Sequence, residues 1–496
     1  MSIKTALSLP FAKFIIRKND KWKKNAVKIQ QDLLFSLIKK AQNTSFGKDH
    51  NFSEISNYSD WKKNVPIRDY EDLKDYVQAI IDGEENVLWP EKPIYFCETS
   101  GTTSGTKYIP ISKESMPHHI TAARDAILSY IAETKNTSIV TGKMIFLQGS
   151  PELSKTGNIL TGRLSGIVAH HIPAYLSKNR LPTFATNCIQ DWEEKIDAIV
   201  DETLSENMSL ISGIPPWVQM YFEKLQEKTG KKIAAIFPNF DLFIYGGVNY
   251  EPYRKTFEKL IGKQVDGVEL YPASEGFIAY QDSQKEEGML LCVNHGIFYE
   301  FIPAEEFQNK NPKRISLSDV EIGVNYVLIL NTNAGLWAYN LGDTIKFVSI
   351  NPYRIVVSGR IKHFTSAFGE HVIAAEIEKS LKEALEKFPG RVNEFHVAPQ
   401  VSPESGLPFH EWFVEFDEQP TDLGGFTKEL DVNLQKRNAY YKDLISGNIL
   451  RPLEVSIIGK NGFRKYMNSI GKLGGQNKVP RLANDRKIAN QLRSFV

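Results

Sequence analysis

Hydrophobic positions recur at helical spacing in the first part of the chain. Residues 26–42 carry apolar side chains on one face, which predicts an amphipathic helix. Further helices are predicted from Trp61, after a capping stretch at 56–60, and over 70–81. Residues 1–25 are partly apolar, but Pro10 and Lys13 interrupt the pattern. We therefore expect this segment to pack on the body of the protein and not to act as a targeting segment.

Strand patterns begin near residue 94 and then alternate with helices. Short strands are predicted at 94–96 and 108–111, and a helix from 112 to 133. His118 and His119 fall near the start of that helix, point to different faces, and are expected at the surface or in a capping role. Later strands are predicted at 143–148, 209–213, 240–244 and 268–271, with helices opening at Pro216 and Pro252. The segment 149–166 is interpreted as a loop.

The pattern changes twice in the second half of the chain. Residues 290–360 are poor in helix signals and predict a small antiparallel barrel or sheet. After residue 362 a helix (371–387), two strands (394–400, 409–417), a helix (426–440) and a strand (453–458) predict a separate α+β module. The predicted organisation is a domain over 1–357, a hinge at 358–362 and a cap domain over 363–496.

Composition narrows the class of protein. A chain of 496 residues with 42% hydrophobic and 24% charged residues is typical of a multidomain globular protein. A net charge of +1 leaves no overall signal for nucleic acid or a membrane as partner. Three scattered cysteines form no metal spacing or disulfide framework, which favours a reducing cytoplasm. We expect a monomer or weak dimer.

A run of Ser, Thr and Gly between the strands at 94–96 and 108–111 carries the first chemical signal. Its glycines let backbone N–H groups turn inward, and hydroxyls and a lysine add donors, as a polyphosphate requires. The spacing does not fit a Walker A loop, because three residues separate Gly101 from Gly105 and Thr106 precedes Lys107. The alternative is a flexible surface linker, which the tight apolar flanks disfavour. The candidate phosphate-binding residues are Thr99, Ser100, Gly101, Thr102, Thr103, Ser104, Gly105 and Lys107.

With Tyr108-Ile-Pro110 behind it, this run resembles the phosphate loop of the adenylate-forming superfamily. That superfamily includes acyl-CoA synthetases, adenylation domains and luciferases. The form here is most similar to the auxin-responsive (Gretchen Hagen) acyl-acid amido synthetases. The resemblance implies an α/β fold, with a large N-terminal domain of mixed sheets and a barrel-like subdomain, and a small mobile α+β C-terminal domain.

Two further motifs extend the resemblance. Tyr271-Pro-Ala-Ser-Glu-Gly276 is similar to the family's second motif, which implies that Tyr271, Ala273 and Ser274 lie beside the nucleotide and that Glu275 serves the ATP–magnesium site. Asp343, at the end of Tyr339-Asn-Leu-Gly-Asp, resembles the aspartate that binds both ribose hydroxyls. The alternatives are a helix cap for Ser274-Glu275 and a turn for Asp343. The backbone at Gly246, Gly247 and Val248 would flank adenine.

Two motifs surround the predicted cap domain. Ser358-Gly-Arg-Ile-Lys362 resembles the superfamily hinge, with Arg360 near ribose and Lys362 as pivot. Gly474-Gly-Gln-Asn-Lys-Val-Pro-Arg481 is similar to the family's Gln-x-Lys-Val-Pro-Arg run, which implies that Lys478 is the mobile catalytic lysine. Read singly, each of these charged side chains could be an ordinary solvated group. Plant members usually carry Tyr-Arg-Tyr-Arg before Gly-Asp, where this chain has Trp337-Ala-Tyr-Asn-Leu341, so hormone specificity is not transferred.

The resemblance implies an ATP- and Mg²⁺-dependent ligase acting on a small carboxylic acid and an amino acid. The acid would be adenylated and the acyl group passed to the amine, with release of pyrophosphate and AMP. Two alternatives stay open: a ligase that forms a coenzyme A thioester, and a non-catalytic nucleotide-binding protein. The sequence does not identify the acyl acid.

Overall fold

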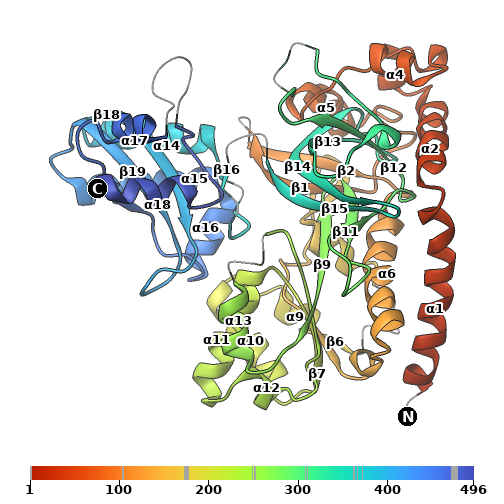
Figure 1. Ribbon diagram of the computed structural model, residues 1–496, viewed down its shortest axis with the longest axis horizontal. Coiled ribbons are helices and arrows are strands. Elements are labelled where there is room, and N and C mark those ends of the chain that lie inside the picture. The colour runs from red at the N-terminus through yellow and green to blue at the C-terminus, as the bar shows by residue number, and fades with distance from the viewer. Residues whose placement is uncertain are drawn as a thin grey trace.

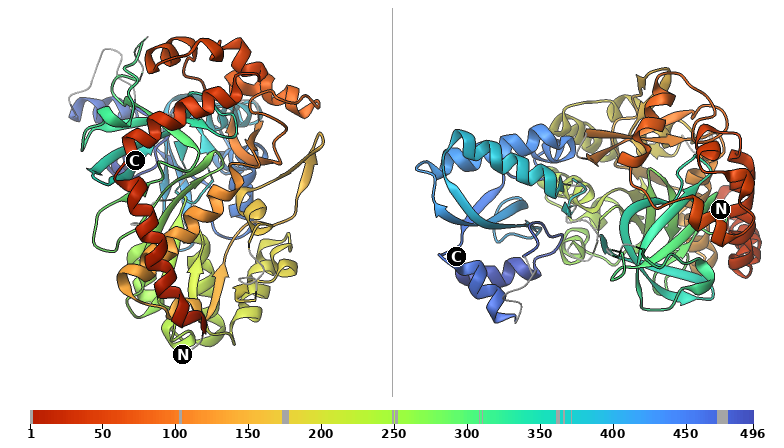
Figure 2. Two further views of the ribbon diagram at one scale, coloured as in Figure 1. Left: turned by 90° about the vertical axis from the view of Figure 1, so that its right-hand side faces the viewer. Right: turned by 90° about the horizontal axis from the view of Figure 1, so that it is seen from above.

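A computed structural model describes most of the chain (Figure 1). The described residues are 3–102, 105–172, 178–248, 250, 253–307, 309, 311–360, 364–365, 367–370, 372–470 and 479–496. A large body carries a smaller C-terminal domain on one side, and helix α1 runs along the opposite flank (Figures 1 and 2). No helix within the described part of the chain combines the length and the apolarity that crossing a membrane requires.

The N-terminal segment packs on the body, as expected, and it does so as a long helix. Helix α1 packs on α6, with Ala12, Ile15 and Trp22 buried against the body. The predicted helices over 26–42 and 70–81 are present. The helices of this region are α1 (Ile3–Lys23), α2 (Ala26–Ala41), α3 (Ser45–Asp49), α4 (Tyr58–Asn64) and α5 (Lys74–Ile81), with short 3₁₀ turns at Phe52–Glu54 and Glu71–Leu73.

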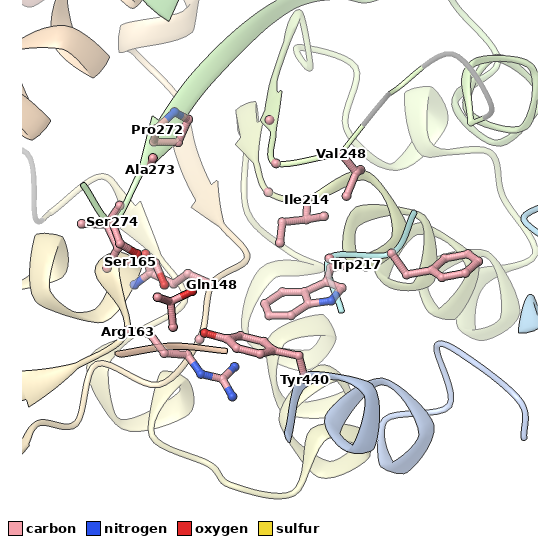
Figure 3. A pocket seen from close by; sticks show the side chains of 18 of the residues that line it. Gln148, Arg163, Ser165, Ile214, Trp217, Val248, Pro272, Ala273, Ser274 and Tyr440 are labelled. Carbon is pink, nitrogen blue, oxygen red and sulfur yellow. The ribbon is translucent and has the colours of Figure 1, made fainter. Parts of the chain in front are cut away.

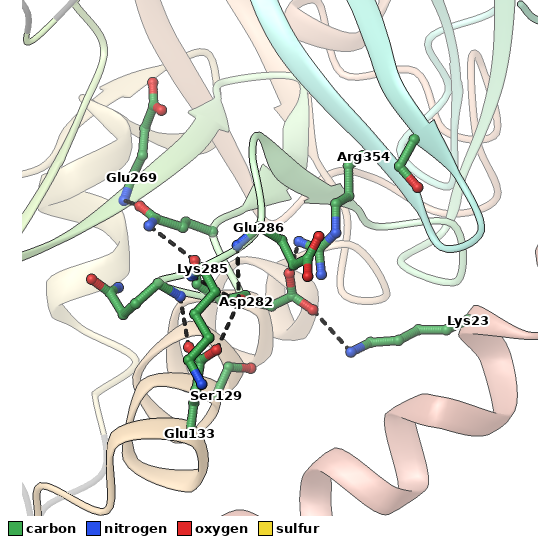
Figure 4. A network of polar contacts seen from close by, with 12 residues as sticks. Lys23, Ser129, Glu133, Glu269, Asp282, Lys285, Glu286 and Arg354 are labelled. Atoms are coloured by element: carbon green, nitrogen blue, oxygen red, sulfur yellow. Dashed lines mark hydrogen bonds and ion pairs between the residues drawn. The ribbon is translucent and has the colours of Figure 1, made fainter. Parts of the chain in front are cut away.

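A buried acidic residue ties α1 to the body (Figure 4). The ammonium of Lys23 lies 2.9 Å from a carboxylate oxygen of Asp282, and Arg354 contacts the other oxygen. The Asp282 side chain is only 4% exposed, so both cations are needed to keep its charge stable. The neighbouring Ser283 donates to Glu133 of α6 (2.8 Å), so this segment fastens two helices at once.

One mixed sheet forms the centre of the body. Its order is β12-β13-β14-β15-β11-β10-β9-β8-β7-β3-β6. From β6 to β9 neighbouring strands are parallel, and from β9 to β12 they are antiparallel. The strands are β3 (Lys143–Phe146), β6 (Arg180–Leu181), β7 (Met208–Ser212), β8 (Leu242–Gly246), β9 (Asp266–Ala273), β10 (Gly276–Tyr280), β11 (Met289–Leu291), β12 (Ile297–Pro303), β13 (Asn325–Thr332), β14 (Tyr339–Ile350) and β15 (Tyr353–Arg360).

The helix-poor segment 290–360 forms antiparallel strands, as predicted, and they are hydrogen-bonded in one sheet with the parallel strands. Helices cover both faces of the large sheet, as its two-sided burial requires. Helices α1 and α6 pack on one side, and α10, α11 and α13 on the other. The covering helices are α6 (Met116–Thr134), α10 (Trp192–Thr203), α11 (Pro215–Thr229) and α13 (Arg254–Ile261), with short helices α7 (Leu164–Ala169), α9 (Phe184–Asn187) and α12 (Ile233–Ile236).

A smaller sheet, of order β2-β1-β5-β4, holds the Ser/Thr/Gly run. Strands β1 (Tyr95–Thr102) and β2 (Gly105–Ile111) form a hairpin that extends further into this run than predicted. The segment 149–166 is not a simple loop, because it contains β4 (Ser154–Thr156), β5 (Ile159–Gly162) and the start of α7. The prediction missed these strands because neither is long enough to display an alternating pattern.

The C-terminal domain is a separate α+β unit, as predicted. Its sheet has the order β18-β19-β20, and one predicted helix is in fact two, α15 and α16, because Asn438 breaks it and caps α16 through Tyr441 N (2.8 Å). Its elements are β16 (Phe364–Thr365), β17 (Val372–Ile373), α14 (Ala374–Lys387), β18 (Arg391–Gln400), β19 (Phe409–Glu418), α15 (Leu423–Arg437), α16 (Ala439–Ser446), β20 (Glu454–Ile457), α17 (Gly462–Ser469) and α18 (Lys487–Leu492), followed by a 3₁₀ turn at Arg493–Phe495.

Candidate active site

A cleft of about 1750 Å³ lies between the body and the C-terminal domain. Segments far apart in the sequence line it together: the end of β1, the turns after β8 and β9, strand β14 and the C-terminal domain. The sequence-predicted residues with described side chains that line this cleft are Thr99, Lys107, Gly246, Gly247, Val248, Tyr271, Ala273, Ser274, Glu275 and Asp343. The predicted phosphate loop and the predicted ribose aspartate therefore face the same cavity.

The hairpin β1–β2 positions the donors of the candidate phosphate loop. Thr99 pairs with Lys107 and Thr102 with Gly105, with an irregular register between Thr99 and Thr102. Ser100, Gly101, Thr102 and Gly105 are described by their backbone alone, and Thr103 and Ser104 lie outside the described residues. The Lys107 ammonium lies 5.8 Å from the centre of the Tyr70 ring, which holds the lysine stem against the hairpin.

The turn after β8 brings the backbone close to its neighbour. An added Cβ at Gly246 would meet the carbonyl oxygen of Leu270 at 2.3 Å, so only glycine fits beside β9. Gly247 has a φ of +82°, a conformation that glycine adopts without strain. These two positions form the smooth wall of the cleft on which a flat ring could lie.

Beside this wall, β9 and β14 bring two polar groups together. The Tyr271 hydroxyl donates to an Asp343 carboxylate oxygen at 2.5 Å, and Asp343 is only 6% exposed. Glu275 is also mostly buried and lies beside the Tyr339 hydroxyl, where burial first and this carboxylate second raise the pKa of that phenol. Behind them the Cys97 thiol lies 3.1 Å from the Ser274 hydroxyl, and burial raises its pKa to about 12, so it stays protonated.

The described residues contain no group of three His, Cys, Asp or Glu side chains able to cage a metal ion. Glu275 alone still fits Mg²⁺, because this ion is commonly bound by one or two carboxylates together with substrate phosphates. The position of Glu275 near the candidate phosphate hairpin is consistent with that arrangement.

A second part of the cleft was not identified from the sequence (Figure 3). Trp217, Ile214 and Val248 provide apolar walls, and Gln148, Arg163 and Ser165 add polar groups. Val248 is the one that the sequence analysis named; no short motif marks the others, which come from scattered positions in the least patterned part of the chain.

The C-terminal domain closes this part of the cleft with α16. The guanidinium of Arg163 lies over the Tyr440 ring at 4.4 Å and donates to Asp443 at 2.5 Å. The Tyr440 hydroxyl lies 3.5 Å from the carbonyl oxygen of Glu98, next to the phosphate hairpin. Burial raises the pKa of Tyr440 to about 12, so it stays a neutral donor. Arg163, Tyr440 and Asp443 together form an interdomain clasp.

The two motifs around the cap domain are only partly described. Ser358 and Gly359 line the cleft at the end of β15, Arg360 is described by its backbone, and Lys362 lies outside the described residues. Lys478 also lies outside them, but Pro480 lines the cleft. The Pro480 carbonyl oxygen is 2.6 Å from His396 Nδ1, which fixes the segment after Lys478 on the C-terminal domain.

Comparison with known proteins now decides the family. The GH3 family N-terminal domain matches residues 15–183 and 162–265, the central domain 290–360, and the C-terminal domain 375–487. The chain belongs to the GH3 family. Its resemblance to acyl-acid amido synthetases, read from five short motifs, is thereby confirmed.

Among similar GH3 relatives is an indole-3-acetic acid-amido synthetase, GH3.15 of Arabidopsis thaliana, 25% identical over 95% of this chain and 93% of the relative. A jasmonoyl–L-amino acid synthetase, GH3.5 of Oryza sativa subsp. japonica, is 22% identical over 93% of each chain. The solved structure of the GH3.15 acyl acid amido synthetase from Arabidopsis in complex with 2,4-DB has a TM-score of 0.61, at 17% identity over 96% of this chain and 95% of that one. A 2-hydroxyisobutyryl-CoA ligase structure reaches a TM-score of 0.58, at 14% identity over 96% and 93%. These two structures support the two-domain adenylate-forming fold.

Proposed function

We propose that this GH3 protein is an ATP-dependent acid-amido synthetase. It adenylates a small carboxylic acid and passes the acyl group to the amine of an amino acid. One observation carries the proposal: the phosphate hairpin, Glu275 and Asp343, which are far apart in the sequence, line a single cleft. The relatives named as amino acid synthetases, which align over nearly the whole chain, support the same reaction class.

In the first half-reaction, a carboxylate oxygen of the acid attacks the α-phosphorus of ATP and pyrophosphate leaves. Positioning and charge stabilisation dominate the catalysis of such a transfer. The backbone and hydroxyls of the 99–107 hairpin, with Lys107, would hold the β- and γ-phosphates. Asp343, oriented by Tyr271, would accept hydrogen bonds from the ribose hydroxyls, and the turn at 246–248 would flank adenine. Mg²⁺ held by Glu275 would neutralise phosphate charge.

In the second half-reaction the amine attacks the acyl carbonyl, an amide forms, and AMP leaves. We propose that the C-terminal domain rotates about residues 358–362 between the two steps. Lys478 would bridge the carboxylate and the phosphate in the first step and withdraw for the second. The three cysteines are free thiols, which supports our placing the protein in the cytoplasm.

The test is carboxylate-dependent exchange of labelled pyrophosphate into ATP across a library of acids. We expect exchange with at least one acid, and Lys478→Ala should lower it by roughly three orders of magnitude, the scale for removing a group that stabilises developing charge. Unchanged exchange in this variant would remove Lys478 from the mechanism. Lys460→Ala, at another lysine of the C-terminal domain, is the control.

The main alternative keeps the adenylation and changes the acceptor to the thiol of coenzyme A. The structural likeness to a CoA ligase concerns the fold, which both acceptor classes share. AMP release measured with each acceptor in turn separates them, and dependence on coenzyme A instead of amino acids would reassign the second half-reaction.

A further inference from the structure

Helix α1 presents an exposed apolar ridge to solvent. Leu7, Phe11 and Phe14 are 62%, 47% and 64% exposed. Their spacing of four and three residues puts them on one face, beside the face that buries Ala12 and Ile15. Figure 2 (left) shows α1 on the outside of the body, along its full length. Two phenylalanines exposed to water on successive turns are energetically unfavourable, and the buried face of the helix does not explain them.

The same helix concentrates positive charge. Helix α1 contains six lysines and arginines and one aspartate, and one of the six, Lys23, is paired with Asp282, whereas the whole chain has a net charge of +1. Arg17, Lys18 and Lys21 are exposed and continue the ridge toward the C-terminal end of α1. The near-zero net charge of the whole chain therefore conceals a local basic surface next to the apolar ridge.

We propose that α1 docks the protein on an anionic lipid surface. Aromatic and aliphatic side chains beside lysines and arginines are the composition of helices that lie in the membrane interface. Each basic side chain near such a surface is attracted by its negative potential. The ridge is convex, so it can enter a deformable headgroup layer without a matching groove. Binding is reversible, because three apolar side chains bury less surface than a lipid anchor.

A second copy of the chain fits this ridge less well. Parallel pairing of two α1 ridges would bring the basic groups Arg17, Lys18 and Lys21 of both copies together, and like charges at close range oppose such pairing. An anionic surface instead satisfies the apolar and the basic parts of the ridge at once.

The docked orientation leaves the candidate active site accessible. The ridge lies on the flank opposite the C-terminal domain (Figure 1), and the cleft opens between that domain and the body. A membrane on the α1 side would therefore obstruct neither the cleft nor a movement of the cap. The inference does not depend on the proposed reaction.

The test is co-sedimentation of the full chain with vesicles of phosphatidylcholine alone and with vesicles that also contain phosphatidylserine. We expect binding only to the anionic vesicles, weakening as salt is raised. Phe11→Ser/Phe14→Ser should lower the affinity by about tenfold or more, because both aromatic rings lose their contact with lipid. Lys18→Glu/Lys21→Glu should lower it by at least about tenfold, because two attractive charges become repulsive.

Matched controls separate the ridge from general effects. Lys255→Glu/Lys259→Glu makes the same charge change on the exposed face of α13, and Phe184→Ser removes another exposed ring. Both should bind like the wild type, and thermal unfolding should be unchanged in all four variants. No binding to anionic vesicles, or equal loss in the α13 control, would overturn the proposal. So would a dimer in light scattering that the Phe11/Phe14 variant abolishes, because a second copy would then cover the ridge.

Discussion

The Tyr271 hydroxyl and the Asp343 carboxylate meet at 2.5 Å, although β9 and β14 are not neighbours in the sheet. This hydrogen bond fixes the orientation of the carboxylate before any nucleotide binds. Each carboxylate oxygen has two lone pairs, so Asp343 can still accept from both ribose hydroxyls.

Asp343→Asn should therefore lower kcat/KM for ATP in pyrophosphate exchange by about 10- to 100-fold, the range expected for lost hydrogen bonds to a charged group. Tyr271→Phe keeps the ring and removes only the orienting hydroxyl, so its effect should be about tenfold or less. A larger loss in Tyr271→Phe than in Asp343→Asn would mean that the tyrosine itself contacts the nucleotide.

The interdomain clasp should bias the position of the cap domain. The Arg163–Asp443 pair is partly exposed (33% and 53%), so it is weak enough to break in each catalytic cycle. Asp443→Asn should change the ratio of amide formation to pyrophosphate exchange by about three- to tenfold. Glu429→Gln removes an exposed ion pair of similar geometry, with Lys387, inside the C-terminal domain and should leave that ratio unchanged. An equal loss in both half-reactions of Asp443→Asn would speak against a role in domain position.

Two buried histidines should make the fold sensitive to acid. His119 and His295 are buried near His118, and burial lowers their pKa values to about 4 and about 3. Below the ordinary pKa of 6.5 these two histidines bind protons in the unfolded chain but stay neutral in the folded chain. The contribution of the two neutral histidines to the free energy of unfolding is therefore fully present above pH 6.5. It falls as the pH drops toward 4, by about 2 kcal/mol per histidine between pH 6.5 and 5.

His295→Gln should flatten this loss. Urea unfolding at pH 7 and pH 5 measures it, and His170→Gln, at an exposed histidine outside the cluster, is the control. If the difference in unfolding free energy between the two pH values is the same in His295→Gln and the wild type, His295 is not buried in its neutral form.

The anchor of α1 gives a prediction on stability. Asp282→Asn removes the buried carboxylate that Lys23 and Arg354 share, so unfolding free energy should fall by about 3 kcal/mol. Asp20→Asn is the matched control, because Asp20 lies 3.8 Å from the same lysine but is half exposed, and it should cost less than about 0.5 kcal/mol. If the two substitutions lower the free energy of urea unfolding equally, the burial of Asp282 does not strengthen its contribution to stability.

Much of the fold and site was predictable because it depends on short-range signals. Apolar periodicity identified α2, β7 and β9, and Asp343 lines the same cleft as Thr99 and Lys107 of the candidate phosphate hairpin. His119 was expected at a surface or cap and is instead buried, because it lies on the same face of α6 as the buried Met116 and Ala122. Residue numbers alone do not reveal such tertiary contacts.

The misses share a physical origin. Arg163 and Tyr440 acquire their positions only when two domains meet, so no local pattern marks them. The helix predicted over 426–440 runs across the break between α15 and α16 and omits most of α16, although Asn438, a good N-cap, offered a signal for the break. The departure at Trp337 also became clear only in three dimensions, where its ring packs against Phe52 and Trp61. The next residue, Ala338, stands where the family run has its first arginine and is fully buried.

In the hairpin of β14 and β15, Asp343 is the cross-strand partner of Arg360. With the proposed pivot at 358–362, the ribose bound by Asp343 would lie next to the residues about which the C-terminal domain rotates. Replacement of ATP by the acyl-adenylate would then change contacts directly at the pivot. The bound nucleotide and the domain rotation would be coupled through one pair of neighbouring strands.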